Sequence, residues 1–269
     1  MSDLLQPTVT SGEAAPSPQP PVRVHSRRSR GWLASIQSLA VTVVIAVFVI
    51  TFLVQAFQIP SQSMENTLLI GDYLLVDKVR YGHGGVWGDI LPYSRIQRAD
   101  IIVFRYPVHP QQHFVKRVIG VPGDRVRVVD RQVLVNGVPI KESYVIHTRA
   151  DRDHFRDDFP YTDIPSADTE PRWWEELPKL VHNGDLVVPP NKYFVMGDNR
   201  DESQDSRYWG FVPREDIVGR PFLIYWSLRS PRPADETPSS RGDRLSAFLY
   251  GVTHLLQDTR WDRTFRIVR

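Results

Sequence analysis

The stretch Gln132-Val133-Leu134-Val135-Asn136-Gly137-Val138 indicates the fold most directly, because it predicts a β-hairpin. The Asn-Gly dipeptide favours the tight turn that joins two antiparallel strands, and β-formers flank it on both sides. Outward from this hairpin, short apolar or alternating runs are broken by Gly, Pro and Asp, as expected of strands joined by turns. These runs are residues 74–76, 101–104, 115–119, 126–129, 193–196 and 222–226. Long helical periodicity is missing from residues 58–229, so we expect a mainly β fold of antiparallel sheets.

Composition excludes several classes of function. The 269 residues, 41% of them hydrophobic, allow one body of ordinary domain size with appendages, or two small domains. A net charge of +2 gives no indication of nucleic-acid binding. The chain has no cysteine, which excludes disulfides, thiolate metal sites and a cysteine nucleophile. Its eight histidines lack metal-ligand spacing, so we expect neither a metal nor another cofactor.

Residues 31–64 contain no charged side chain and predict a single transmembrane helix. The apolar core at 39–54, with its flanks, is long enough to cross ~30 Å of hydrocarbon. Trp32 is placed as an interfacial anchor. Basic residues before the span should stay in the cytoplasm, which would put everything after residue 57 on the outer face. They are Arg23, Arg27, Arg28 and Arg30.

Two alternatives for the apolar segment stay open. It could be a buried core helix, or a cleaved signal peptide, since Val54-Gln55-Ala56 resembles the small-x-small pattern before a cleavage site. The segment is long for a signal peptide, and a serine of interest, Ser63, lies directly beyond it. We therefore favour a retained membrane anchor.

A serine and a lysine carry the chemistry that the sequence suggests. Ser63 lies in Pro60-Ser61-Gln62-Ser63-Met64, and Lys116 lies in the apolar run Phe114-Val115-Lys116-Arg117. A serine hydroxyl needs a base, which can be histidine, a terminal amine or a neutral lysine. A lysine pKa of ~10.4 must fall by roughly three units, or roughly 4 kcal/mol, and apolar burial can supply that shift. Without other motifs, a lysine that extends from a strand edge is the favoured interpretation, and the serines could form a turn or helix cap. The histidines fit less well, because His83 and His147 lie in polar contexts and His113 heads a strand.

Five segments, in order, resemble those of bacterial type I signal peptidases. The first is Ile59-Pro60-Ser61-Gln62-Ser63-Met64-Glu65-Asn66-Thr67-Leu68, and the last is Met196-Gly197-Asp198-Asn199-Arg200-Asp201-Glu202-Ser203-Gln204-Asp205-Ser206-Arg207-Tyr208-Trp209-Gly210. Residues 71–76, 98–104 and 116–124 match the segments between them. Together they bracket residues 57–226, which makes the resemblance specific. Two departures are Asn66, where many members have proline, and Ala99, where many have glycine.

The resemblance implies roles for individual residues. Ser63 matches the nucleophile and Lys116 the general base. Ser61 matches the hydroxyl that stabilises the oxyanion together with the Ser63 N–H, a type of donor typically worth ~2.7–4 kcal/mol. Ser203 matches a serine that orients the lysine. The resemblance also implies a structural pair near the site and positions lining small apolar pockets for substrate residues −1 and −3. The pair is Asp205 and Arg207; the pocket positions are Phe57, Ile59, Leu68, Leu74 and Val115.

These expectations define a domain plan. We expect a disordered cytoplasmic arm at 1–30, the anchor at 31–57, a catalytic β domain at 58–229, and a linker with an amphipathic helix at 230–269. An excursion at about 146–180 has no matching motif, and its Trp173-Trp174 pair is expected to cap a small local core. The C-terminal helix could dock on the protein itself or lie on the membrane. Its apolar face is Leu245, Phe248, Leu249, Val252, Leu255 and Leu256.

The expected function is a serine endopeptidase of the bacterial cytoplasmic membrane that cleaves signal peptides from exported preproteins. Its partners would be those signal peptides, the lipid bilayer and, nearby, the secretion translocon, with no nucleic acid. A dedicated peptidase for one pilin-like substrate and a catalytically idle binding module are the alternatives. A Ser-Lys autoprotease joined to a DNA-binding domain is disfavoured, because the N-terminal region offers a membrane span instead of a helix-turn-helix.

Overall fold

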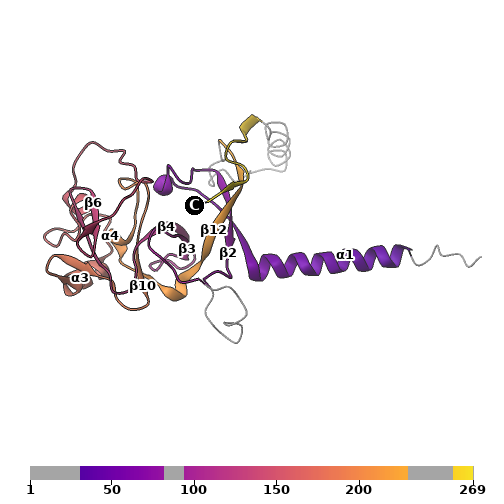
Figure 1. Cartoon of the computed structure of the whole chain (residues 1–269), viewed down its shortest axis with the longest axis horizontal. Coiled ribbons are helices and arrows are strands. Elements are labelled where there is room, and N and C mark those ends of the chain that lie inside the picture. Colours follow the sequence, from indigo (N-terminus) through magenta and orange to yellow (C-terminus); the bar gives the residue numbers. More distant parts are fainter. Residues whose placement is uncertain (1–30, 82–93, 230–256, 269) are drawn as a thin grey trace, which may run out of the picture. The chain divides into compact units, whose positions relative to one another are not determined.

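The computed structural model describes residues 31–81, 94–229 and 257–268, and the chain divides into two compact units, Met1–Ile45 and Ala46–Arg269 (Figure 1). The apolar segment forms helix α1 (Gly31–Phe48), which continues into a π-helical turn, η2 (Val49–Leu53). Within the 22 residues of Trp32–Leu53, the most apolar 18-residue window has a mean hydropathy of 2.5, and none of that window is buried. By length and composition, this helix could cross a membrane.

An eight-stranded antiparallel sheet holds the elements that the resemblance singled out. Its strands follow the order β1-β2-β12-β3-β4-β10-β11, with β13 paired to β12. In the register of β3 with β4, Ile102 lies opposite Lys116 and Val103 opposite Val115. The strands are β1 (Val54–Gln58), β2 (Asp72–Asp77), β3 (Ile101–Arg105), β4 (His113–Gly120), β10 (Lys192–Met196), β11 (Val212–Pro213), β12 (Ile217–Ser227) and β13 (Arg266–Ile267).

A second, five-stranded antiparallel sheet contains the predicted hairpin. Its order is β7-β6-β5-β9-β8. Asn136 and Gly137 both adopt positive φ, 55° and 78°, which is the backbone that a two-residue hairpin turn requires. The mainly β, antiparallel prediction is therefore confirmed. The strands are β5 (Arg125–Val129), β6 (Gln132–Val135), β7 (Val138–Pro139), β8 (Val181–His182) and β9 (Asp185–Val187).

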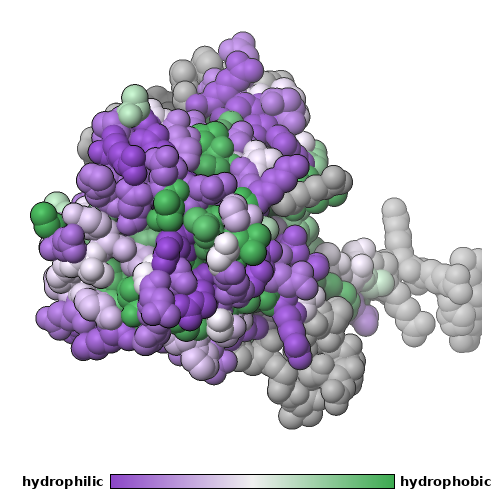
Figure 2. All heavy atoms as spheres, turned by 60° about the vertical axis from the view of Figure 1, so that its left-hand side comes forward, coloured by the Kyte–Doolittle hydropathy of each residue, from purple (hydrophilic) through white to green (hydrophobic). Residues whose placement is uncertain are grey.

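The excursion packs against the core of the five-stranded sheet. Its helices are α2 (His154–Asp157) and α3 (Pro171–Leu180). Trp173 is buried in that core, and Trp174 packs against it. Gly210 makes room for Trp173, because a Cβ on Gly210 would lie 2.7 Å from the indole. The face of the molecule shown in Figure 2 is mostly hydrophilic, with apolar side chains in small groups.

The remaining elements are short, and the C-terminal segment joins the large sheet. They are η3 (Gln62–Met64), α4 (Ser206–Trp209) and η4 (Arg214–Asp216). The predicted apolar face of a C-terminal helix, at 245–256, lies outside the described residues. Beyond it, Arg263 pairs with the buried carboxylate of Asp72 at 2.6 Å and donates to the carbonyl of Thr67 at 3.0 Å. The C-terminal segment thus supports the turn that follows Ser63.

Candidate active site

Ser63 and Lys116 meet beside strand β4 of the large sheet. The short helix η3 carries Ser63, and strand β4 carries Lys116. Lys116 Nζ donates a hydrogen bond to Ser63 Oγ at 2.6 Å, and the two residues are only 4% and 7% exposed. The two side chains that the sequence analysis assigned to nucleophile and base are therefore in direct contact.

The surroundings of Lys116 favour its neutral form. Burial is the largest cause, and it lowers the pKa of Lys116 to about 8. Asp205 acts in the opposite direction, and Arg207 adds to the lowering. The Phe114 ring lies 5.7 Å from Nζ. An amine with this pKa is neutral in roughly a tenth of the molecules at pH 7, and that neutral form can accept a proton.

Asp205 leaves Lys116 without a direct carboxylate partner because it is bound to Arg207. The guanidinium donates to both Asp205 oxygens at 2.9 Å, and both side chains are fully buried. Burial alone would raise the pKa of Asp205, but Arg207 holds it below its ordinary value. Arg207 also donates to the carbonyls of Arg156 and Arg200, so the pair fixes the loop around the site.

Ser61 lies close enough to act on the same chemistry. Its Oγ is 3.4 Å from Ser63 Oγ, and the residue is exposed at the cleft. The Ser61 hydroxyl can therefore turn toward a substrate oxygen held at Ser63. Its role as an oxyanion donor stays a prediction.

Ser203 is buried near the dyad but is bound elsewhere. Its Oγ accepts a hydrogen bond from the Gly197 N–H at 3.1 Å, and within the described residues no hydrogen bond joins it to Lys116. A Cβ on Gly197 would lie 2.3 Å from Ser203 Oγ and 2.4 Å from the Ser63 carbonyl oxygen. Only glycine allows these two serines to approach the same point. The orienting role of Ser203 stays a prediction.

A cleft of about 290 Å³ opens at Ser63. Phe57, Ile59 and Val115 line it; that they hold substrate residues −1 and −3 stays a prediction. Leu68 and Leu74 do not; both are fully buried in the cluster behind the cleft wall. Burial alternates along β2, and this places the Leu74 side chain on the core face. Other lining residues are Gln58, Pro60, Ser61, Met64, His113, Phe114, Lys116, Glu202 and Gln204.

A second buried cation beside the dyad was missed by sequence reasoning. Arg117, the residue after Lys116, makes a two-pronged contact with Asp198 at 2.8 and 2.6 Å. Thr67 Oγ1 donates to the same carboxylate at 2.5 Å, and the Ala99 carbonyl accepts from Arg117. Alternation along β4 was the available signal, because it sends Arg117 to the face opposite Lys116.

Among the described residues, no three His, Cys, Asp or Glu side chains gather as ligands for a metal ion. A neutral amine that contacts a serine hydroxyl can take up its proton directly, which is the chemistry that this hydrogen-bonded pair could perform.

Comparison with known proteins agrees with this geometry. Residues 32–226 match the family model described as signal peptidase, peptidase S26. Signal peptidase I of Pseudomonas fluorescens is 36% identical over 198 residues, which cover 68% of each chain. That of Aquifex aeolicus is 35% identical over 231 residues, covering 73% of this chain and 85% of the relative. The enzyme of Leptolyngbya laminosa is 31% identical, covering 82% and 94%. The chain therefore belongs to the signal peptidase family, the S26 family of serine endopeptidases.

Proposed function

We propose that the protein is a membrane-anchored signal peptidase in which Ser63 and Lys116 form the catalytic dyad. The observation that carries this proposal is the 2.6 Å hydrogen bond between Lys116 Nζ and Ser63 Oγ in a buried setting that lowers the lysine pKa to about 8. The relatives are named signal peptidase I, which supports signal peptides of exported preproteins as the substrates.

The first half of the reaction forms an acyl-enzyme. Neutral Lys116 takes the proton of Ser63 Oγ, which attacks the carbonyl carbon of residue −1. The carbonyl oxygen becomes an oxyanion that the Ser61 hydroxyl and the Ser63 N–H stabilise. The resulting Lys116 ammonium gives its proton to the departing amine of the mature protein, and the peptide bond breaks to leave an ester on Ser63.

The second half releases the signal peptide. Lys116, neutral again, takes a proton from water, whose oxygen attacks the ester carbonyl. The tetrahedral intermediate collapses, Ser63 Oγ regains a proton from Lys116, and the signal peptide departs as a carboxylic acid. Asp205 is held by Arg207 throughout, so the proton moves only between Lys116, Ser63, the leaving amine and water.

The cleft supports a requirement for small residues at −1 and −3. Phe57, Ile59 and Val115 form its apolar wall, and Leu68 and Leu74 back that wall from the core. The helix Trp32–Leu53 would anchor the enzyme with its N-terminus in the cytoplasm and its catalytic body on the outer face of the bacterial membrane. Because signal peptides also enter this bilayer, near the translocon, the anchor raises their effective concentration.

Cleavage of a model preprotein tests the dyad. The wild-type enzyme, Ser63→Ala and Lys116→Ala are compared, with Lys179→Ala as the control because Lys179 is exposed on α3. Removing one residue of a catalytic unit typically lowers the rate by more than ~10⁴-fold. We expect both dyad variants to lose activity to this extent and Lys179→Ala to retain it.

The alternatives give different outcomes in the same assay. Equal cleavage by all four proteins would exclude the Ser-Lys mechanism. No cleavage by the wild type would favour an idle binding module. Cleavage of one substrate from a panel of unrelated preproteins would favour a dedicated processing peptidase.

A further inference from the structure

The loop at residues 201–204 separates two cavities of the catalytic body. Glu202 and Gln204 line the catalytic cleft, and all four residues of the loop also line a second cavity of about 270 Å³. Ser203 belongs to this shared wall and lies against the same point as the Ser63 carbonyl. The second cavity therefore begins next to the nucleophile.

The rest of the lining of the second cavity is polar and, apart from Tyr208, comes from the excursion. The excursion, which has no matching motif, thus supplies side chains to a cavity beside the catalytic cleft. The other lining residues are Arg149, Asp153, Arg156, Ser166, Asp168 and Tyr208. Arg156 is bound by Asp157 and Asp201, and its charge is neutralised within the protein.

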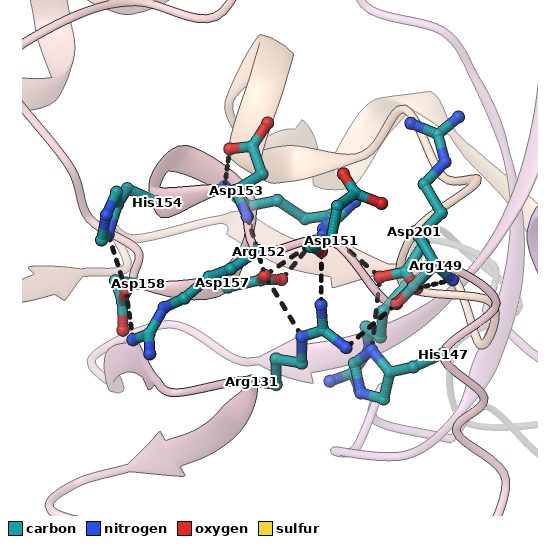
Figure 3. A network of polar contacts seen from close by, with 12 residues as sticks. Arg131, His147, Arg149, Asp151, Arg152, Asp153, His154, Asp157, Asp158 and Asp201 are labelled. Atoms are coloured by element: carbon teal, nitrogen blue, oxygen red, sulfur yellow. Dashed lines mark hydrogen bonds and ion pairs between the residues drawn. The ribbon is translucent and has the colours of Figure 1, made fainter.

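Arg149 and Glu202 form an ion pair at this wall. Arg149 Nε donates to Glu202 Oε1 at 2.8 Å, and the side chains are 50% and 27% exposed. The Arg149 N–H donates to the buried carboxylate of Asp201 at 2.7 Å, and His147 contacts the same carboxylate at 3.3 Å. Figure 3 shows Arg149 and His147 meeting at Asp201. The backbone of Arg149 is thus fixed, while its guanidinium remains open to solvent.

The polarity of the cleft gives the direction of the substrate. Its apolar wall, from β1 and β4, suits the small side chains of residues −1 and −3. Glu202 and Gln204, by contrast, belong to the loop that lines both the catalytic cleft and the polar cavity. If a substrate continues from the apolar wall past Ser63 toward the polar cavity, the residues after the scissile bond would reach Glu202.

We infer that Arg149 and Glu202 form a binding site for charged or hydrogen-bonding side chains in the first residues of the mature protein. This inference rests on the proposed signal peptidase function. An acidic substrate residue binds Arg149 and a basic one binds Glu202, so the wild-type pair accepts both signs in preference to an apolar residue. The pair is partly exposed, and the contact is weak enough for the mature protein to leave before water enters.

A charge series tests the inference with one preprotein. Lys, Glu or Leu is placed in turn at each of the first three mature positions, and kcat/KM is measured for the wild type, Glu202→Gln and Arg149→Gln. Glu202→Gln leaves Arg149 unpaired and should shift the Lys-to-Glu ratio toward Glu by about fivefold. Arg149→Gln leaves Glu202 unpaired and should shift the ratio toward Lys by a similar factor.

Arg152→Gln is the matched control. Arg152 is 51% exposed and pairs with Asp158 at 2.9 Å, but it lines neither cavity. The ratio of kcat/KM for the Lys substrate to that for the Glu substrate should be the same in this variant as in the wild type. If Arg149 and Glu202 had a purely structural role, their replacement would lower kcat/KM for all three substrates together. It could not shift the Lys-to-Glu ratio in opposite directions.

The outcomes separate this inference from the function on which it rests. Opposite shifts in the two variants support it. Efficient wild-type cleavage with equal or same-direction shifts overturns the inference and leaves the proposed function standing. If the wild type cleaves none of the preproteins, both the inference and the proposed function are contradicted.

Discussion

Two neighbouring residues of β4, Lys116 and Arg117, are equally buried cations with opposite surroundings. Each residue is 4% exposed. Arg117 is held by both oxygens of Asp198. Lys116 instead contacts a neutral hydroxyl, and the nearby carboxylate of Asp205 is bound to Arg207.

The difference separates structure from chemistry. A buried charge that is fully paired holds its loop in place, and it remains charged. A buried amine without a direct carboxylate partner loses part of its affinity for a proton, which is what a base requires. One strand supplies both because its side chains alternate between faces.

The largest effect should come from breaking the Arg117 pair. Arg117→Met leaves Asp198 buried without its cation, and removing one partner of such a pair typically costs ~3–5 kcal/mol. We expect the free energy of unfolding, measured in urea, to fall by about that amount. Arg105→Met is the control, because Arg105 is 48% exposed and its pair with Asp216 is 3.4 Å long. Equal losses in the two variants would contradict the assigned importance of burial.

Replacing Lys116 should raise the free energy of unfolding, whereas replacing Arg117 lowers it. The fall of its pKa from 10.5 to about 8 corresponds to about 3 kcal/mol of destabilisation while the amine is charged in both states. Below about pH 8, Lys116→Met removes this penalty and should stabilise the fold by up to about 3 kcal/mol.

The pH dependence of that gain follows from linkage. Between about pH 8 and 10.5 the unfolded lysine binds more protons than the folded one, so wild-type stability rises with pH. The advantage of Lys116→Met should therefore shrink over this range. Urea unfolding at pH 7 and pH 10 measures it, and an advantage independent of pH would refute a lowered pKa.

A smaller effect should come from Ala99, beside Arg117. Ala99 has a φ of +67°, a left-handed backbone that costs an alanine roughly 1–2 kcal/mol, and its carbonyl accepts from Arg117. Ala99→Gly relieves this strain but adds freedom to the unfolded chain. We expect a net stabilisation of up to about 1 kcal/mol by thermal unfolding, with activity retained. A loss of stability would show that the backbone is relaxed at Ala99.

The local sequence pattern was enough to predict the strands and the hairpin. It could not predict which distant residues pair with each other. The Asn136-Gly137 turn follows from backbone preferences within the dipeptide itself. The contact of Arg117 with Asp198 spans 81 residues and depends on the register of β10 against β4, which no local pattern encodes. Strand alternation also explains Leu74, which belongs to the core behind the cleft.

For the site, the motifs identified residues and the structure added their partners. Ser63 and Lys116 meet, although 53 residues separate them. The binding of Ser203 to the Gly197 N–H could not be predicted, because it depends on how closely the loop returns to β10. The excursion had no motif, and its place beside the cleft follows only from the packing of Trp173 and the binding of Arg149 to Asp201.

The pH dependence of kcat/KM on a model preprotein tests the central claim most directly. Because the base must be neutral to act, the rate should rise with pH through the pKa of Lys116, with a midpoint near 8. His113, which lines the cleft, has a pKa lowered from 6.5, chiefly by burial. A midpoint near 8 that persists in His113→Asn would support Lys116 as the base. A midpoint at or below 6.5, or one near 10.5, would contradict it.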